Sequence, residues 1–202
     1  VMYNSRYQGF TPPTKPSVYV ETDTGKVILY WNDIAESSVD VLTGYADFEG
    51  YKIYKSMDGG SSWGSASERI YDTDGLFVGW RPHAQFDLSA QEDSLHCVYS
   101  NNYDCNRDLR RNHSINGPDP YFPWFSLGND TGLDIIRMVE EDWKVVNGIT
   151  YKYKYIDDNV IDGLEYTYSV VAYDRGVEPT YETRYIELGN GQFETIIDTN
   201  FS

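Results

Sequence analysis

The segment from Val160 to Asp174 limits what this chain can fold into more than any other part of the sequence. Asp162 and Gly163 are typical turn residues. The residues after them alternate between aromatic or apolar and polar side chains, and successive side chains of a strand point to opposite faces. The segment therefore predicts a turn that leads into a core strand. The residues expected on its core-facing side are Leu164, Tyr166, Tyr168, Val170 and Ala172.

Tyr166 lies at the start of this predicted strand, close to the turn. Its hydroxyl is within reach of the turn backbone, so we expect a hydrogen bond that ties the strand to the preceding loop.

The composition favours β-structure. Aromatic residues make up 16% of the 202 residues, and tyrosine alone occurs 19 times. Aromatic side chains favour strands over helices, so we predict an all-β chain. The length exceeds that of a plain sandwich of about 100 residues and is short for two domains, which predicts a single domain with a large insertion.

The net charge of the chain limits the kinds of partner that it can bind. Asp and Glu number 32 and Lys and Arg 16, which gives a formal net charge of −16. Such a surface repels the phosphates of nucleic acids and argues against a nucleic-acid partner. It attracts cations, of which calcium is the natural candidate. The alternative is that the charge keeps the protein soluble in an extracellular or saline medium.

No apolar run in the sequence is long enough for a membrane span, so none is expected. The chain begins with Val1 and shows no basic and then apolar leader. We therefore expect a processed protein or a piece of a larger one.

Further strands are predicted by the same alternation. Residues 17–23 and 26–31 form a predicted hairpin, and residues 48–56 form a third strand. Residues 146–153 repeat the pattern of residues 161–168, which indicates two successive strands with similar entry turns. Residues 181–188 are expected to form the closing strand, and residues 192–197 a short additional strand or a linker.

Three of these segments, around Trp31, Tyr54 and Tyr166, resemble the second, third and sixth strands of a fibronectin type III domain. The resemblance covers about residues 17–56 and 150–188. It implies an immunoglobulin-like β-sandwich in which Trp31 is the core tryptophan, Tyr54 a packing residue and Tyr166 the tyrosine-corner residue. A long, mostly irregular insertion, about residues 58–148, separates the third strand from the later ones. Modules lengthened in this way resemble those of large secreted bacterial surface proteins.

Residues 17–202 are thus expected to form one domain, preceded by an arm or linker at residues 1–16. Prolines at positions 12, 13 and 16 exclude a helix in this arm. The arm either lies on its own domain or pairs with the sheet edge of a neighbouring subunit.

The sequence from Ser56 to Trp63 matches the Asp-box pattern of β-hairpins. Asp58 is expected to bond the turn backbone and Trp63 to cover the hairpin. The motif predicts a structural lock and not a catalytic site.

Cys97 and Cys105 are the two cysteines. A disulfide between them is the first interpretation and would require an oxidising compartment. Zinc bound by the two thiolates with His96 or His113, and two free buried thiols, are the alternatives. Just before them, Ser89 and Glu92 form a capping box that predicts the start of a short helix.

Two acidic pairs are candidate calcium ligands. Asp72 and Asp74 precede Gly75, as in the opening of a calcium loop, and Asp157 and Asp158 form a second pair. An ordinary turn is the alternative interpretation of the first pair. No cofactor is required by the sequence, and structural calcium is the one that it suggests.

Aromatic side chains concentrate in the insertion. Sugar rings stack on such faces, so these residues are candidate glycan ligands, with a satellite hydrophobic core as the alternative. The candidates are Trp80, Tyr121, Trp124 and Phe125, with Phe122 beside them.

No catalytic motif is present, so we predict that the chain is not an enzyme. The first functional hypothesis is a secreted or cell-surface structural or adhesive module, with other protein subunits or a surface polymer as partner. Such a module could form a filament through residues 1–16. The second is a carbohydrate-binding module that uses the aromatics of the insertion, and the third is a hydrolase of unknown class.

Overall fold

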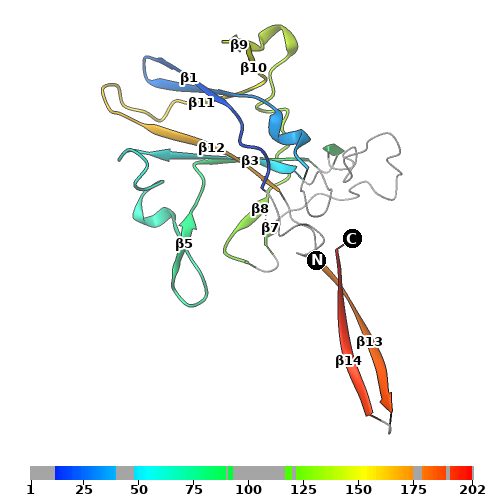
Figure 1. Cartoon of the computed structure of the whole chain (residues 1–202). Coiled ribbons are helices and arrows are strands. Elements are labelled where there is room, and N and C mark those ends of the chain that lie inside the picture. The colour runs from blue at the N-terminus through cyan, green and yellow to red at the C-terminus, as the bar shows by residue number, and fades with distance from the viewer. Residues whose placement is uncertain are drawn as a thin grey trace.

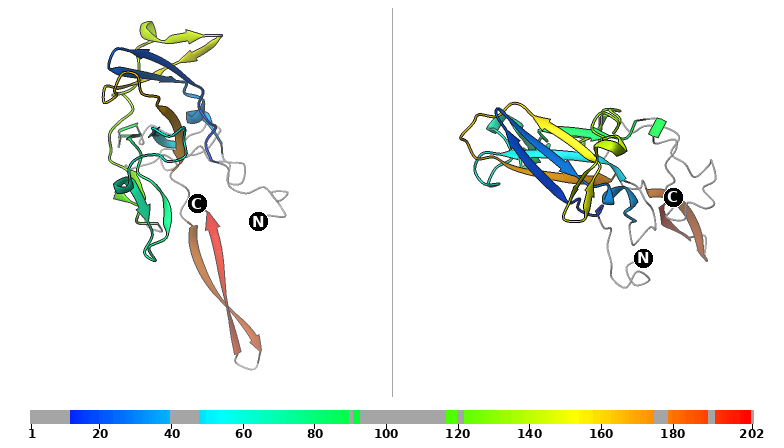
Figure 2. Two further views of the ribbon diagram at one scale, coloured as in Figure 1. Left: turned by 90° about the vertical axis from the view of Figure 1, so that its left-hand side faces the viewer. Right: turned by 90° about the horizontal axis from the view of Figure 1, so that it is seen from above.

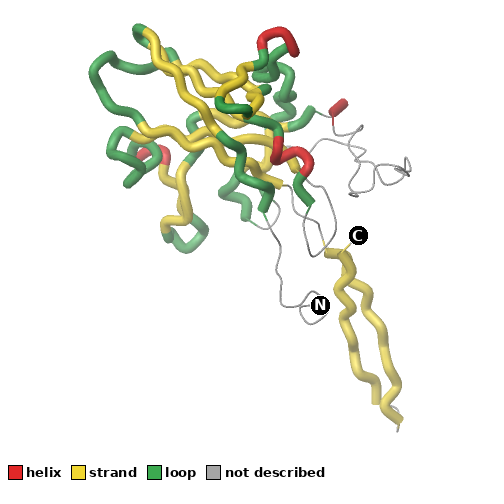
Figure 3. The backbone as a smooth tube through the Cα atoms, turned by 45° about the horizontal axis from the view of Figure 1, so that its top comes forward, coloured by secondary structure: helices red, strands yellow, loops and turns green. Residues whose placement is uncertain are grey.

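The computed structural model of the chain describes residues 12–39, 48–89, 91–92, 117–119, 122–174, 179–189 and 192–201, the last two ranges by their strands alone (Figure 1). Nearly all regular structure in these residues is antiparallel strand (Figure 3). The prediction of an all-β chain is confirmed. Among the described residues, no helix is long and apolar enough to cross a membrane.

The first three-stranded sheet has the order β1-β2-β11. It consists of β1 (Val18–Asp23), β2 (Lys26–Trp31) and β11 (Tyr153–Asp157). β1 and β2 form the predicted hairpin, in which Gly25 adopts a φ of 67°. β11 pairs with the other side of β2, so two strands distant in sequence flank a central one.

The second three-stranded sheet has the order β12-β3-β6. β3 (Phe48–Ser56) has the predicted bounds, and β12 (Thr167–Asp174) is the predicted core strand. β6 (Ala84–Asp87) comes from within the expected insertion, so that insertion contributes a strand to the main sheet. Gly50 permits this pairing, because a Cβ there would lie 2.2 Å from the carbonyl oxygen of Phe86.

The hydrophobic core lies between the two sheets, and Trp31 is at its centre. The Trp31 side chain is fully buried, with its ring centroid 5.6 Å from that of Tyr51 and 5.7 Å from that of Tyr153. Trp31 and Tyr153 belong to one sheet and Tyr51 to the other, so these rings join the sheets. The remaining core residues are Val27, Leu29, Ala35, Phe48, Ile53, Phe86, Leu88, Leu133, Ile136, Val170 and Ala172.

Short elements extend from this core. The two-stranded pairs are β4 (Arg69–Tyr71) with β5 (Phe77–Trp80), β7 (Gly117–Pro118) with β8 (Ser126–Gly128), and β9 (Lys144–Val146) with β10 (Ile149–Tyr151). Three 3₁₀ turns are η1 (Ile34–Ser37), η2 (Ala66–Glu68) and η5 (Glu140–Asp142).

The predicted turn at Asn147 and Gly148 joins β9 and β10, and both residues have positive φ, 52° and 79°. Asn-Gly is the preferred pair for such a two-residue hairpin.

The structure provides the hydrogen bond expected at Tyr166. The N–H of Ile161 donates to the Tyr166 hydroxyl over 3.0 Å. Two other expectations for this region differ from the structure. Leu164 is 49% exposed, because it precedes β12 and no described strand covers it. Tyr54 lies on the face of β3 opposite the core residue Ile53, and its ring packs on Trp63 instead.

The strand expected to close the fold does not pair with the main sheets. β13 (Pro179–Gly189) pairs along its length with β14 (Gln192–Phe201). Figures 1 and 2 show this hairpin extending away from the two sheets. The expectation that residues 181–188 complete the main fold is therefore wrong for this structure: among the described strands, β13 pairs with β14 alone.

The described part of the N-terminal arm lies on its own domain. Ser17 N–H donates to the side-chain oxygen of Asn32 over 2.9 Å, and Pro16 is buried. Thr14 bonds Ser38 through its backbone N–H. Residues 1–11 of the predicted arm, residues 1–16, lie outside the described residues, so pairing of the arm with a neighbouring subunit stays a prediction.

Candidate functional site

The Asp-box turn follows β3 and is closed by hydrogen bonds to the Asp58 carboxylate. Asp58 Oδ1 accepts from the Ser62 N–H over 2.8 Å, and Asp58 Oδ2 accepts from the Ser62 hydroxyl over 2.7 Å. The Ser56 hydroxyl donates to the same carboxylate over 2.7 Å. These bonds, led by the Ser62 N–H, lower the pKa of Asp58 to about 2. The carboxylate is thus charged at neutral pH and holds the turn closed.

The β4–β5 hairpin follows, and it is closed at both ends. At its base, the Arg81 N–H donates to the carbonyl oxygen of Glu68 over 2.7 Å. At its tip, Asp72 Oδ1 accepts from the N–H groups of Asp74 over 3.0 Å and Leu76 over 2.8 Å. Asp72 therefore forms an aspartate turn with the backbone of Asp74 and Leu76, and calcium binding by Asp72 and Asp74 stays a prediction.

One face of this hairpin carries a strip of three rings and one cation, the aromatic strip Arg69, Tyr71, Phe77 and Trp80. The register places Tyr71 opposite Phe77 and Arg69 opposite Trp80. The Phe77 ring lies 6.2 Å from that of Tyr71 and 5.4 Å from that of Trp80. The Arg69 guanidinium lies 5.2 Å from the Trp80 ring, a cation–π distance.

The strip faces solvent. Phe77 is 51% exposed and Tyr71 47% exposed, and Trp80 is half-buried beside them. Exposed rings grouped on one surface, with an arginine, are typical of surfaces that bind a partner. The strip is the candidate functional site.

The other predicted glycan residues do not join this strip. Phe125 lies against Gly79, which pairs with Ile70 on the opposite face of the hairpin; a Cβ at Gly79 would lie 3.5 Å from the Phe125 ring. Trp124 is half-buried, and its Nε1 is buried without a hydrogen-bond partner in the described structure. Tyr121 lies outside the described residues. The structure thus separates Trp80 from the rings that follow β7.

Sequence reasoning missed Tyr71 and Phe77. The signal that could have found them is the turn at Asp72 to Gly75, because a hairpin with its tip there places the flanking rings across from each other.

The second predicted calcium pair is also engaged by the protein. Asp157 is buried, and its carboxylate accepts from Tyr168 over 2.7 Å and pairs with Lys55 over 2.8 Å. His83 Nε2 lies 3.4 Å away, and Asp158 is exposed. Across the described parts of the chain, no three His, Cys, Asp or Glu side chains come together in a way that could hold a metal ion. Asp157 is therefore the anchor of a buried polar network.

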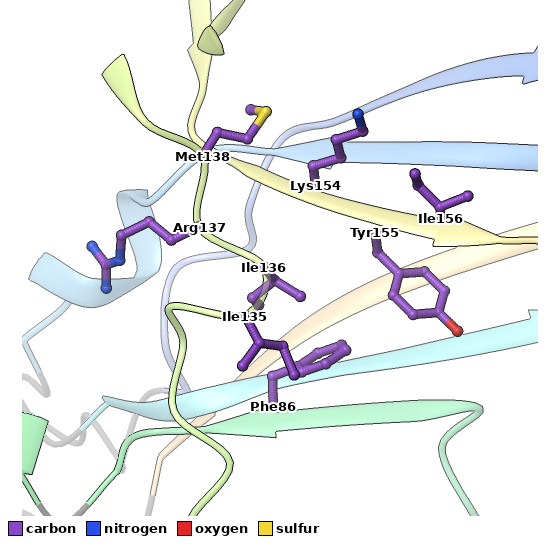
Figure 4. A pocket seen from close by; sticks show the side chains of 8 residues that line it. All are labelled: Phe86, Ile135, Ile136, Arg137, Met138, Lys154, Tyr155 and Ile156. Carbon is purple, nitrogen blue, oxygen red and sulfur yellow. The ribbon is translucent and has the colours of Figure 1, made fainter. Parts of the chain in front are cut away.

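A hollow of about 430 Å³ lies beside β11 and is lined mainly by apolar side chains. In Figure 4 Ile136, Tyr155 and Phe86 face it, while the charged ends of Arg137 and Lys154 point away. The carbonyl oxygen of Ile136 accepts from the Lys154 N–H over 2.8 Å, so this segment covers the outer edge of β11. The hollow lacks converging polar groups and is not a candidate site.

The expected helix start at Ser89 has its capping box, since the Ser89 N–H donates to the Glu92 carboxylate over 2.7 Å and the Glu92 N–H donates to the Ser89 hydroxyl over 3.3 Å. Cys97 and Cys105, with His96 and His113, lie outside the described residues. The disulfide and the zinc alternative therefore stay predictions.

None of the protein families, curated proteins or solved structures compared with this chain matches it.

Proposed function

We propose that this chain is a non-enzymatic structural or adhesive module of fibronectin type III type that works outside the cell. The strand order supports the sandwich. β1 and β2 lie in one sheet with β11, and β3 pairs with β12 in the other sheet. In a sandwich of this type the first, second and fifth strands likewise share one sheet, and the third and sixth strands share the other. The buried Trp31 and the hydrogen bond to Tyr166 support the same assignment.

The exposed aromatic strip is the observation that carries the adhesive role. Its rings stand on a hairpin whose tip is closed by Asp72 and whose base is closed by the Arg81 N–H bond to Glu68, so the surface is preorganised and loses little freedom when it binds. Aromatic residues and arginine are enriched in protein interfaces. The chain as a whole is acidic, and Arg69 places a positive charge within the strip. We infer that the strip contacts a partner on a surface.

The ring geometry favours a protein partner over a flat polysaccharide. The planes of Tyr71 and Phe77 meet at 70° and those of Phe77 and Trp80 at 72°. Rings tilted in this way do not form one flat platform, but they do form pockets and edges that side chains of another protein can fill.

Replacing Phe77 by serine should remove this activity. Beads coated with the purified chain should retain bacterial cell-envelope fragments, and the F77S variant should retain at least about tenfold fewer, because an exposed aromatic anchor is lost. The control is Phe122→Ser, since Phe122 is 53% exposed but is not part of the strip.

Pretreatment of the envelopes identifies the partner class. Protease should abolish retention, whereas periodate, which destroys sugars, should leave it unchanged. Equal retention of the F77S and F122S variants would rule out the strip as the adhesive surface.

Carbohydrate binding is the second candidate, favoured by the half-buried indole of Trp80 beside the Arg69 guanidinium. On a glycan array the wild-type chain should then bind a defined set of oligosaccharides, and Trp80→Ala should lose that binding by about tenfold or more, because stacking on the indole is lost. Trp124→Ala should have no effect, since its ring lies outside the strip. Binding that survives the two substitutions together would exclude this candidate.

A further inference from the structure

The burial of β1 is the reverse of what its sequence leads one to expect. Val18 pairs with Trp31 and Val20 with Leu29, so both valines are on the core-facing side of the first sheet. They are nevertheless 36% and 45% exposed. The opposite face of β1 is better covered, because Tyr19 packs on the ring of Tyr151 in β10.

In the second sheet, the outer side of β12 has no partner among the described strands. Leu88 N–H donates to the carbonyl oxygen of Glu49, so odd-numbered residues of β3 bond to β6 and even-numbered ones to β12. Lys52 pairs with Val171 of β12, so the odd-numbered residues of β12 direct their backbone groups toward β3. No strand among the described residues pairs with the other side of β12. The residues that direct their backbone groups to that side are Tyr168, Val170 and Ala172.

A groove lies between the end of β1 and the segment that precedes β12. It has a volume of about 350 Å³ and runs between Thr22 at the end of β1 and Leu164 before β12. Ile161 and Leu164 on its wall are 66% and 49% exposed. We refer to these two residues, together with Val18 and Val20, as the strand groove: all four side chains are apolar and exposed, and no described strand covers them.

The chain also holds a strand pair without a further partner. β13 and β14 pair only with each other among the described strands, and an isolated two-stranded hairpin is marginally stable in water. β13 has 11 residues and β12 has 8, so β13 is long enough to follow the whole of β12. The hairpin extends away from the two sheets (Figures 1 and 2), and β14 occupies one edge of β13, so the other edge of β13 can pair with a further strand.

We propose that the strand groove of one molecule receives β13 of a second copy of this chain. β13 then pairs with the outer side of β12 and covers Val18 and Val20, so that the sheet reads β14-β13-β12-β3-β6. Reciprocal exchange between two copies gives a closed dimer, and exchange in one direction gives a chain of subunits. The strand groove shares no residue with the aromatic strip, so this association and the proposed adhesion are separable.

The test is the association state of the full-length chain with charged residues in the groove. Wild-type protein should sediment as a dimer or larger species, and the double variant Val18→Glu and Val20→Glu should weaken association at least about a hundredfold, because two carboxylates would be buried without partners. Val139→Glu with Val145→Glu is the matched control, since these valines are 62% and 63% exposed and lie outside the groove. Unchanged circular dichroism must accompany both variants.

A photo-crosslinking amino acid at position 20 identifies the occupant. In an equal mixture of ¹⁴N- and ¹⁵N-labelled chains, cross-links to the peptide of residues 179–189 should include pairs with one label of each kind. A wild-type monomer at every concentration would overturn the proposal, as would an association that the groove variant leaves intact. Cross-links confined to one label, or made to residues 1–11, would assign the groove to the chain's own hairpin or to its N-terminal arm and would overturn it too.

Discussion

Replacing Trp31 by alanine should lower the free energy of unfolding by about 4 kcal/mol, the usual cost of removing a large buried aromatic side chain. The ring touches Tyr51 of one sheet and Tyr153 of the other, so the cavity would open where the sheets meet. The indole N–H has no hydrogen-bond partner in the described structure, so the loss is one of packing alone. Urea unfolding followed by far-UV circular dichroism measures the change.

Two control variants test whether the loss of stability comes from the buried ring of Trp31. Trp31→Phe keeps most of the ring and should cost about half as much. Trp80→Ala removes a half-buried indole from the aromatic strip and should cost about 1 kcal/mol or less. If Trp31→Ala cost no more than Trp80→Ala, Trp31 would not be the centre of the core.

Replacing Asp157 by alanine should lower the free energy of unfolding by about 3 kcal/mol, because it leaves Lys55 partly buried without its carboxylate. Lys55 keeps its bond to the carbonyl oxygen of Asn159, at 2.6 Å, which limits the loss. The Tyr168 hydroxyl also loses its acceptor. Asp158→Ala is the matched control, since its side chain is exposed and should change stability by less than about 0.5 kcal/mol.

The same network predicts a pH dependence. Burial alone would raise the pKa of Asp157, but the hydrogen bonds from Lys55, Tyr168 and the Asn159 N–H outweigh it and lower the pKa. A carboxyl whose pKa is lowered on folding stabilises the protein above its unfolded pKa, about 4, and loses that contribution as the pH falls through the folded pKa. Wild-type stability should therefore fall more steeply than that of Asp157→Ala as the pH drops below about 4. Equal slopes would show that Asp157 is not held as a charged group.

Local structure was predictable to a large degree. The hairpin of β1 and β2, the bounds of β3, and the turn bonds of Asp58 and Tyr166 all follow from alternation and turn chemistry within a few residues. Each of these features depends on residues that are close together in the sequence, so the local sequence is enough to predict it.

The candidate site was predictable only in part. Trp80 was expected to bind a ligand, and the structure places it in the exposed strip. Tyr71 and Phe77 were missed because their proximity depends on the hairpin register, which a bulge near Tyr71 shifts. Phe125 was grouped with Trp80 by composition, but the two lie on opposite faces of one hairpin.

The sequence by itself determined that the chain is built of strands, where β1, β2 and β3 begin, and which of their faces are apolar. Only the tertiary structure decided which strands pair. β6, which comes from the expected insertion, pairs with the edge of β3, and β13 pairs with β14 and not with β12. The physical reason is that a strand's backbone can bond any free edge of suitable length, so its partner is chosen by the burial available across the whole fold. Val18, Val20 and Leu164 show the result: their alternation directs them to a core, and in this structure no described strand covers them.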